Sequence, residues 1–163
     1  MIVENLLNFL VVILVQFIFL FIHAKSVREL SNLPTYLVQG MILGLPFGIT
    51  FDVIIGKYVG MFDYQLGFTW WFLTINGILS YGIMIANVLL LFRHTLNHMY
   101  FWSVLIGLVY EVVNIFFPVL NWKFSSSAFE YLIVIGVAYA ALTWLMMVAL
   151  RLAYNKHFKL VPF

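Results

Sequence analysis

The sequence predicts an all-α protein, a polytopic transmembrane bundle of five helices that forms a single integral membrane domain over residues 1–163. Two observations carry this prediction. Of the 163 residues, 65% are hydrophobic and only 9% are charged, which is too little polar surface for a soluble fold. Five apolar segments, each about 20 residues long, match the length that a helix needs to cross the hydrocarbon core of a bilayer.

Short polar breaks divide the five segments, so neighbouring helices are expected to pack antiparallel. The breaks contain KSVRELSNLP, KYVGMFDYQLG, RHTLNH and PVLNWKFSSS. The first segment begins with Glu4 in place of the lysines of a signal peptide and lacks a small-residue cleavage site, so we expect a retained helix. The predicted helices lie near residues 5–24, 36–56, 68–92, 99–119 and 127–150.

The basic residues predict the orientation of the bundle, because cytoplasmic loops near helix ends carry the excess of lysine and arginine. Lys57 and Lys123 fall on one side of the five predicted crossings. This bias predicts a multi-pass protein of the cell membrane, with its N-terminus outside and its C-terminus in the cytoplasm. The basic residues on the cytoplasmic side are Lys25, Arg28, Arg93, Arg151, Lys156 and Lys159.

The second and fourth segments resemble each other. GITFDVIIG aligns with GLVYEVVNI at an offset of 59 residues, which matches Gly48 to Gly107 and Asp52 to Glu111. The outer loops also match loosely, MFDYQ against VLNWKF. Because both copies run in the same direction through the membrane, crossings 2–3 and 4–5 are predicted to be parallel repeats about an axis normal to the membrane.

Each acid ends a stripe of small residues spaced four apart, a spacing that falls on one helix face. In a bilayer such stripes let two helix backbones approach closely. We therefore expect both acids to lie inside the bundle, at similar depths across the repeat axis. The stripes are Gly40, Gly44, Gly48 and Asp52 in the second segment, and Ser103, Gly107 and Glu111 in the fourth.

Two interpretations of the acids stay open. A carboxylate inside a membrane costs roughly 2.5 to 3.5 kcal/mol on insertion scales, so it is usually paired, protonated or functional. In the functional interpretation, Asp52 and Glu111 line an outward-opening pocket for a proton, a cation or the polar group of a lipid-like ligand. The candidate ligand-binding set is Asp52, Glu111, Asn76, Ser80 and Asn114. In the structural interpretation each acid bonds to polar groups of adjacent helices and locks the bundle, the available groups being Asn76, Ser80, Asn114, Tyr81 and Tyr139.

The favoured function is that of a non-catalytic integral membrane subunit or binding module. The alternative is a membrane enzyme acting on an isoprenoid or another lipid-soluble substrate, with Asp52 and Glu111, joined by Glu130, as general acid and base. Glu130 also fits a helix entry, because it follows the capping residues SSS and the helix dipole favours an acid there. The expected partners are the lipid bilayer and either a lipid-like ligand or a membrane protein.

Several classes of function are excluded by absent motifs. The chain has no cysteine, so it contains neither disulfides nor thiolate metal sites. It has no phosphate-binding glycine loop, no nucleophile elbow and no basic face for nucleic acid. His94 and His98 have the spacing of metal ligands on a helix, but no carboxylate lies near them in the sequence, so we expect neither a metal nor a cofactor.

Residues 36–150 resemble an uncharacterised family of small five-helix membrane proteins, found largely in spore-forming Gram-positive bacteria. The resemblance is carried by the acid-bearing second segment, by Asn87 in the third, by FFP at residues 116–118 and by Trp122 in the outer loop. It implies the five-helix architecture and no particular reaction.

A weaker likeness is to small polytopic lycopene cyclase domains, whose repeats also combine an acid-bearing helix, an aromatic loop and a following helix. Their proline-x-Glu-Glu element is missing here, because Trp70 and Trp71 occupy its place in the first repeat and a lone Glu130 in the second. The likeness therefore implies an acid-lined pocket for an isoprenoid and argues against carotene cyclisation.

Overall fold

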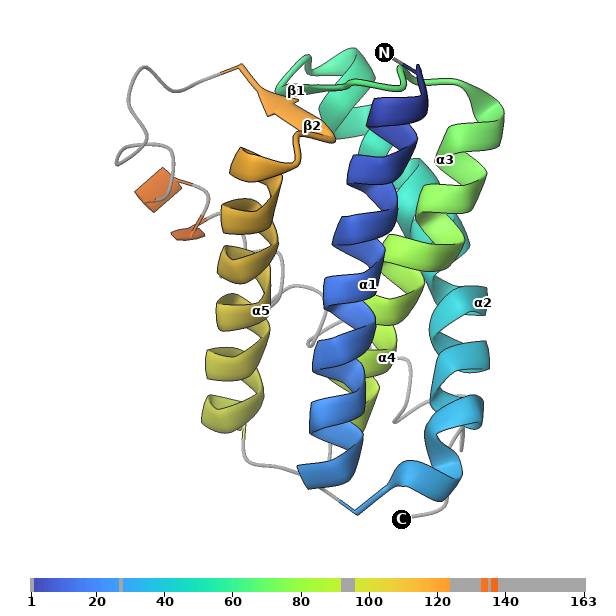
Figure 1. Ribbon diagram of the computed structural model, residues 1–163, viewed down its shortest axis with the longest axis vertical. Helices are drawn as coiled ribbons and strands as arrows, with labels where there is room; N and C mark the ends of the chain where they lie inside the picture. Colours follow the sequence, from blue (N-terminus) through green and yellow to red (C-terminus); the bar gives the residue numbers. More distant parts are fainter. Residues whose placement is uncertain (1, 27, 92–95, 124–132, 135, 138–163) are drawn as a thin grey trace.

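The computed structural model describes residues 2–26, 28–91, 96–123, 133–134 and 136–137. Over these residues the chain is a bundle of upright helices that run side by side (Figure 1). The helices are α1 (Ile2–Ser26), α2 (Leu33–Phe51), α3 (Trp70–Asn76), α4 (Gly82–Leu91) and α5 (Leu96–Phe116), with the 3-10 turn η1 (Leu30–Asn32) before α2. Two π-helical segments complete them: η2 (Asp52–Tyr58) continues α2, and η3 (Gly77–Tyr81) joins α3 to α4.

Three of the described helices are long and apolar enough to cross a membrane. They span Val3–Lys25, Leu30–Tyr58 and Trp70–Leu90, and they correspond to the first three predicted crossings. Helix α5 covers most of the fourth, while the fifth, near residues 127–150, lies almost entirely outside the described residues. The three apolar helices support a membrane location.

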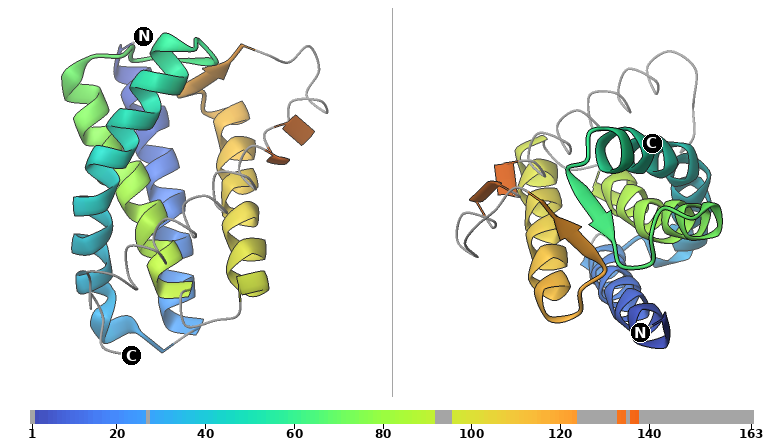
Figure 2. Two further views of the ribbon diagram at one scale, coloured as in Figure 1. Left: turned by 180° about the vertical axis from the view of Figure 1, so that it is seen from behind. Right: turned by 90° about the horizontal axis from the view of Figure 1, so that it is seen from above.

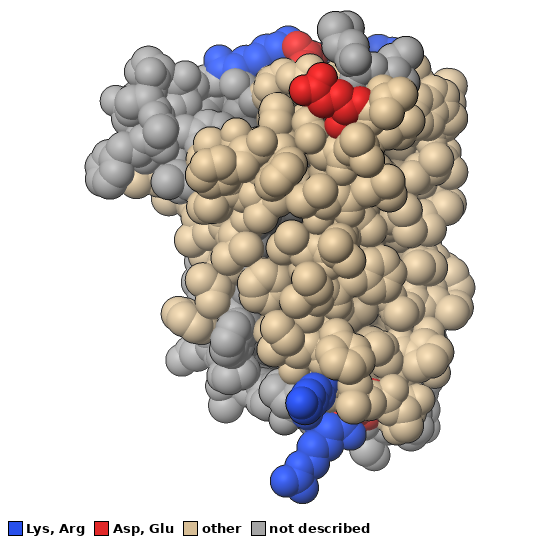
Figure 3. All heavy atoms as spheres, viewed as in Figure 1, with Lys and Arg blue, Asp and Glu red and all other residues tan. Residues whose placement is uncertain are grey.

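Exposed charged side chains gather at the two ends of one face of the molecule (Figure 3). On the face shown in Figure 3, their atoms lie at the top and the bottom, and an uncharged belt separates them. Large apolar side chains are exposed along the middle of α1, among them Leu14 at 59% and Ile18 at 50%. A surface that faces lipid has this character, because the hydrocarbon core extends over about 30 Å.

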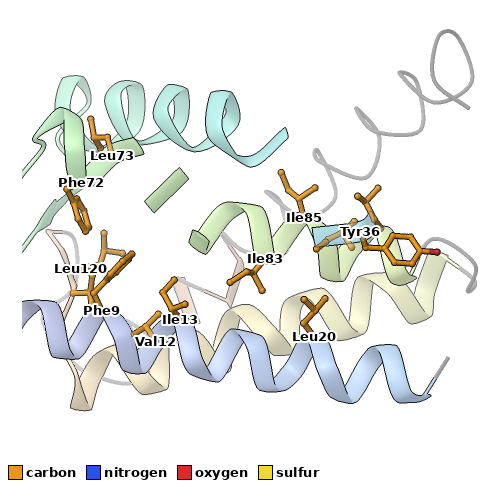
Figure 4. Close-up of a cluster of buried hydrophobic side chains, with 14 of the residues drawn as sticks. Phe9, Val12, Ile13, Leu20, Tyr36, Phe72, Leu73, Ile83, Ile85 and Leu120 are labelled. Atoms are coloured by element: carbon orange, nitrogen blue, oxygen red, sulfur yellow. The ribbon is translucent and has the colours of Figure 1, made fainter. Parts of the chain in front are cut away.

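Helix α1 packs along the third crossing, which is formed by α3, η3 and α4, and runs in the same direction. Phe9 and Leu20 point from α1 into the buried cluster (Figure 4). At one end of this contact the rings of Phe9 and Phe72 meet edge to face, with centroids 5.4 Å apart. At the other end His23 Nδ1 lies 3.0 Å from Asn87 Oδ1.

The glycine stripe of α2 lies against the third crossing, which confirms the prediction for this helix. Gly40, Gly44 and Gly48 are buried, and so is Asp52, the next residue in the series. A Cβ atom on any of the three glycines would overlap atoms of the third crossing, so glycine is what allows the two backbones to approach. The neighbouring residues there are Gly77, Tyr81, Gly82 and Ala86.

The loops that are predicted to be outer depart from the all-α prediction, because they form a two-stranded antiparallel ribbon. Strand β1 (Phe62–Tyr64) pairs with β2 (Leu120–Trp122), and Asp63 lies opposite Asn121. Lys123 Nζ lies 2.7 Å from Asp63 Oδ2, with both side chains about half exposed. We call the end of the bundle that carries this ribbon and the N-terminus the ribbon end (Figures 1 and 2).

Helix α5 ends at Phe116 and not near residue 119 as predicted. The reason is Pro118, whose ring disfavours a helical conformation for the residue before it. Two asparagine side chains of α1 donate hydrogen bonds to backbone carbonyl groups of the loops that carry the ribbon. Asn8 Nδ2 donates to the carbonyl oxygen of Pro118, and Asn5 Nδ2 donates to that of Gln65, both over 3.3 Å.

Candidate functional site

Asp52 stands at the junction of α2 and η2, and its side chain is fully buried. In a π-helical turn a backbone N–H bonds to the carbonyl five residues earlier, as Val59 does to Ile54. Such turns insert one residue into a helix, and they are frequent at functional sites. Asp52 therefore continues the buried face of the glycine stripe, at the point where the α-helix ends and the π-helical segment begins.

Three side chains from three segments donate hydrogen bonds to the Asp52 carboxyl group. The hydroxyl groups of Tyr64 and Tyr81 both donate to Oδ1, over 2.8 and 2.7 Å. The Asn76 amide donates to Oδ2 over 3.0 Å and also lies 3.0 Å from the Tyr64 hydroxyl. We call these four residues the Asp52 cluster. One carboxyl group thus joins β1, the end of α3 and the end of η3 to α2.

Aromatic rings enclose the Asp52 cluster. The rings of Tyr64 and Phe72 meet edge to face with centroids 4.9 Å apart. The hydrogen bonds to Asp52 from the described residues all come from neutral groups, so no cation among these residues is bonded to its carboxyl group. A charge here is stabilised by these hydrogen bonds, away from bulk solvent. The other rings in contact with the two tyrosines are Phe47, Phe51, Phe62 and Phe68.

Two further predicted site residues, Glu111 and Asn114, lie buried on α5. Asn114 Oδ1 accepts from the backbone N–H groups of Val119 and Leu120, both over 2.9 Å, and its Nδ2 donates to the Leu120 carbonyl over 2.7 Å. Asn114 therefore holds the turn from α5 into β2, where the backbone has left the helical pattern. Glu111 is not among the groups that bond to Asp52.

The structure brings together only some of the predicted site residues. Asp52, Asn76 and Tyr81 meet in one cluster, and Asn76 and Tyr81 both donate hydrogen bonds to the acid. Ser80 is buried one turn after Asn76, and its hydroxyl has no hydrogen-bond partner among the described residues. Outside the described residues or side chains lie Glu130, Tyr139, His94, His98, Ser103 and Gly107.

Tyr64 is absent from the residues predicted for the site, although it makes one of the two shortest bonds to Asp52. It lies in MFDYQ, a loop that its length and polarity place at the membrane surface. The signal in the sequence that could have identified Tyr64 is the aromatic character of this loop. Its aromatic side chains can be buried when β1 packs over the end of η2. Phe62 and Tyr64 point inward from alternate positions of β1, and Asp63 between them is exposed.

The described residues contain no group of three or more histidine, aspartate or glutamate side chains that could hold a metal ion. Comparison of the chain with protein-family models, with curated proteins and with solved structures finds no match. The resemblance to the five-helix family and the likeness to lycopene cyclase domains therefore stay predictions. The function has to be argued from the Asp52 cluster itself.

Proposed function

We propose that the protein is a non-catalytic, multi-pass subunit of the cell membrane that binds a proton at the Asp52 carboxyl group. The observation that carries the proposal is the complete burial of this carboxyl group under three neutral hydrogen-bond donors. A buried carboxylate inside a membrane is costly and marks proton relays and ligand sites. No other group in the cluster brings a compensating charge.

Among the ligands expected for an acid-lined site, a proton fits this geometry best. A lipid headgroup or an isoprenoid would have to reach the carboxyl group from outside, and Asp52 has no accessible surface. A cation needs several oxygen ligands that present lone pairs, whereas Tyr64, Asn76 and Tyr81 all direct donors at the carboxyl group. A proton needs no additional space. The enzyme alternative gains no support, because a general acid has to reach its substrate within hydrogen-bond distance.

The Asp52 cluster leaves room for a proton on one carboxyl oxygen. Both tyrosine hydroxyls donate to Oδ1, so a proton on Oδ1 would compete with one of them. Among the described residues Oδ2 accepts only from the Asn76 amide, and its second lone pair can hold a proton without displacing that bond. The hydrogen-bond pattern therefore favours protonation at Oδ2.

For the topology, we propose five crossings with the ribbon end outside the cell. Support comes from the charge distribution, because the lysines at this end are Lys57 and Lys123, and Lys123 is paired with Asp63. Lys25, in the last turn of α1, and Arg28, between α1 and α2, lie at the opposite end. The positive-inside rule then assigns that end to the cytoplasm.

We also propose that crossings 2–3 and 4–5 are parallel repeats, and the register of the ribbon supports this. Adding the offset of 59 to Phe62 and Asp63 gives Asn121 and Trp122. These are the same residues that pair with them, in reverse order: Phe62 with Trp122, and Asp63 with Asn121. A two-fold axis through the middle of the ribbon would therefore place each residue of β1 on the residue of β2 that lies 59 positions later. The same offset matches Asp52 to Glu111.

The test of proton binding is an infrared titration of the reconstituted protein, in which a protonated carboxyl group is seen by its C=O stretching band. Wild-type protein is compared with the variants Asp52→Asn and Glu111→Gln. We expect a band that disappears as the pH rises, that is missing in Asp52→Asn and that persists in Glu111→Gln. If wild type and Asp52→Asn give the same bands at every pH at which the protein stays folded, the proposal is wrong.

A further inference from the structure

Helix α1 presents one stripe of residues to the third crossing. The rings of Phe9 and Phe72 contact each other, with centroids 5.4 Å apart. Further along α1, His23 Nδ1 lies 3.0 Å from Asn87 Oδ1. Gln16 stands midway between Phe9 and His23, seven residues from each. Because seven residues make about two helical turns, these three side chains share one face of α1, and Gln16 points toward the third crossing.

The position that faces Gln16 is defined to within one residue. The two contacts are 15 residues apart on the third crossing and 14 on α1, because the π-helical segment η3 adds one residue. Two turns after Phe72 the chain reaches Leu79, and two turns before Asn87 it reaches Ser80; both belong to η3, which is in contact with α1. Leu79 is half-buried and Ser80 is buried, so Ser80 takes the inner position.

Gln16 and Ser80 also share an unusual property. They are only 7% and 6% exposed, and neither Gln16 Oε1 nor Ser80 Oγ has a hydrogen-bond partner among the described residues. A buried polar atom without a partner costs free energy, above all inside a bilayer. In folded proteins internal water commonly satisfies such atoms. Two of them on facing positions therefore indicate a place that binds a small protic molecule.

We infer that Gln16 and Ser80 form a water site, in which a water molecule bridges α1 and the third crossing. The water donates one hydrogen bond to Gln16 Oε1, and it donates a second to Ser80 Oγ or accepts one from it. Two polar partners are enough to hold an internal water. Ser80 is not among the groups that bond to Asp52, so the inference does not rest on the proposed proton binding.

Apolar side chains close the water site on both sides along the helices. Val12 and Ile13, one turn nearer the ribbon end on α1, are buried (Figure 4). One turn beyond the site, toward the other end, the facing positions are Leu20 and Ile83, which are both fully buried (Figure 4). The polar contact between α1 and the third crossing is therefore local, and its water serves to join these two helices.

The direct test is solid-state NMR of the full chain in lipid bilayers, carbon-deuterated and labelled with nitrogen-15, in which magnetisation passes from water to nearby N–H groups. We expect transfer to the side-chain amide of Gln16, whose signal is identified by its loss in Gln16→Met. At the same mixing time the backbone N–H groups of Leu20 and Ile83 should receive none. Ser80→Ala should abolish the transfer to Gln16. A wild-type protein without this transfer has a dry contact, and the inference is then wrong.

Stability gives an independent measurement, because a hydrated and a dry contact respond to the same replacements with opposite sign. In a dry contact, Gln16→Met or Ser80→Ala removes an unsatisfied polar atom and makes the protein more stable. In a hydrated contact either replacement leaves the water with a single partner. We then expect each to raise the unfolding equilibrium constant in mixed detergent micelles about tenfold. The double variant, which removes both partners, should raise the constant by much less than the product of the single effects.

The matched controls are Gln65→Met and Ser31→Ala, which make the same replacements at exposed positions and should leave the unfolding equilibrium constant unchanged. Single variants of Gln16 and Ser80 that are more stable than wild type would show a dry contact. Single effects that multiply in the double variant would show that the two side chains do not share a water. Either result overturns the inference, as does a transfer from water to Gln16 that persists in Ser80→Ala.

Discussion

The hydroxyl group of Tyr64 donates a hydrogen bond to Oδ1 of Asp52 over 2.8 Å, and it thereby connects the ribbon to the interior of the bundle. Tyr64 belongs to β1, and β1 pairs with β2, which follows α5. The bond therefore lies between the second crossing and β1, the strand that pairs with the loop after α5. This contact therefore joins the buried carboxyl group to both strands of the ribbon end.

Replacing Tyr64→Phe should lower the free energy of unfolding by about 1–3 kcal/mol, because it removes a buried hydrogen bond to the acid and leaves Oδ1 with one donor fewer. The measurement is unfolding in mixed detergent micelles, followed by circular dichroism. Tyr58→Phe is the matched control, since Tyr58 is 79% exposed and should tolerate the loss of its hydroxyl group. Equal stability of the two variants would show that the bond contributes nothing.

Replacing Gly44→Ala should separate α2 from the third crossing. The added Cβ would come within 2.6 Å of the Gly82 Cα and 2.7 Å of the Gly77 carbonyl oxygen, both backbone atoms that cannot turn away. We expect a loss of about 1–3 kcal/mol in the free energy of unfolding, the usual cost of overpacking. Ile42→Ala on the same helix is the control, because Ile42 is 66% exposed. A Gly44→Ala protein as stable as this control would contradict the close backbone contact.

The register of the ribbon can be tested by disulfide formation, because the natural chain has no cysteine. The pair Asp63→Cys and Asn121→Cys lies directly opposite across the ribbon and should oxidise readily. The pair Asp63→Cys and Lys123→Cys is diagonal and should oxidise slowly. Both double variants lose the ion pair, so its absence cannot explain the difference. Faster oxidation of the diagonal pair would show that the register is different.

Topology is tested by reporter fusions placed after Arg93 and after Phe163. Both should report the cytoplasm if the chain makes five crossings with the ribbon end outside, as the bias of basic residues predicts. A fusion within the loop that carries β1 should report the opposite side. An external signal from either of the first two fusions would overturn the proposed orientation.

The helices could be predicted from the sequence because their signals are local. Length and hydropathy locate the first three crossings, and the four-residue spacing of Gly40, Gly44 and Gly48 correctly places Asp52 inside. Asn76 and Tyr81 were recognisable as partners, since they are polar groups in an apolar segment. These features depend on residues a few turns apart, which is the range over which a helical pattern is readable.

The ribbon and the π-helical segments could not be predicted in this way. Each strand has only three residues, and its partner lies in a loop far along the chain, so no alternating pattern develops. The extra residue of η3 changes which side chains face α1, and nothing in GILSY marks the insertion. Tyr64 joins the Asp52 cluster only because the ribbon brings its loop back over the bundle.

The position of the partners of Asp52 has a consequence for how the protein enters the membrane. Tyr64, Asn76 and Tyr81 all follow Asp52 in the chain, so the acid has none of these donors while the second crossing alone has left the ribosome. Releasing that helix into lipid by itself would expose an unpaired carboxyl group to hydrocarbon. The second crossing should therefore wait in the translocon until synthesis has passed Tyr81, and leave it together with the third as a preassembled hairpin.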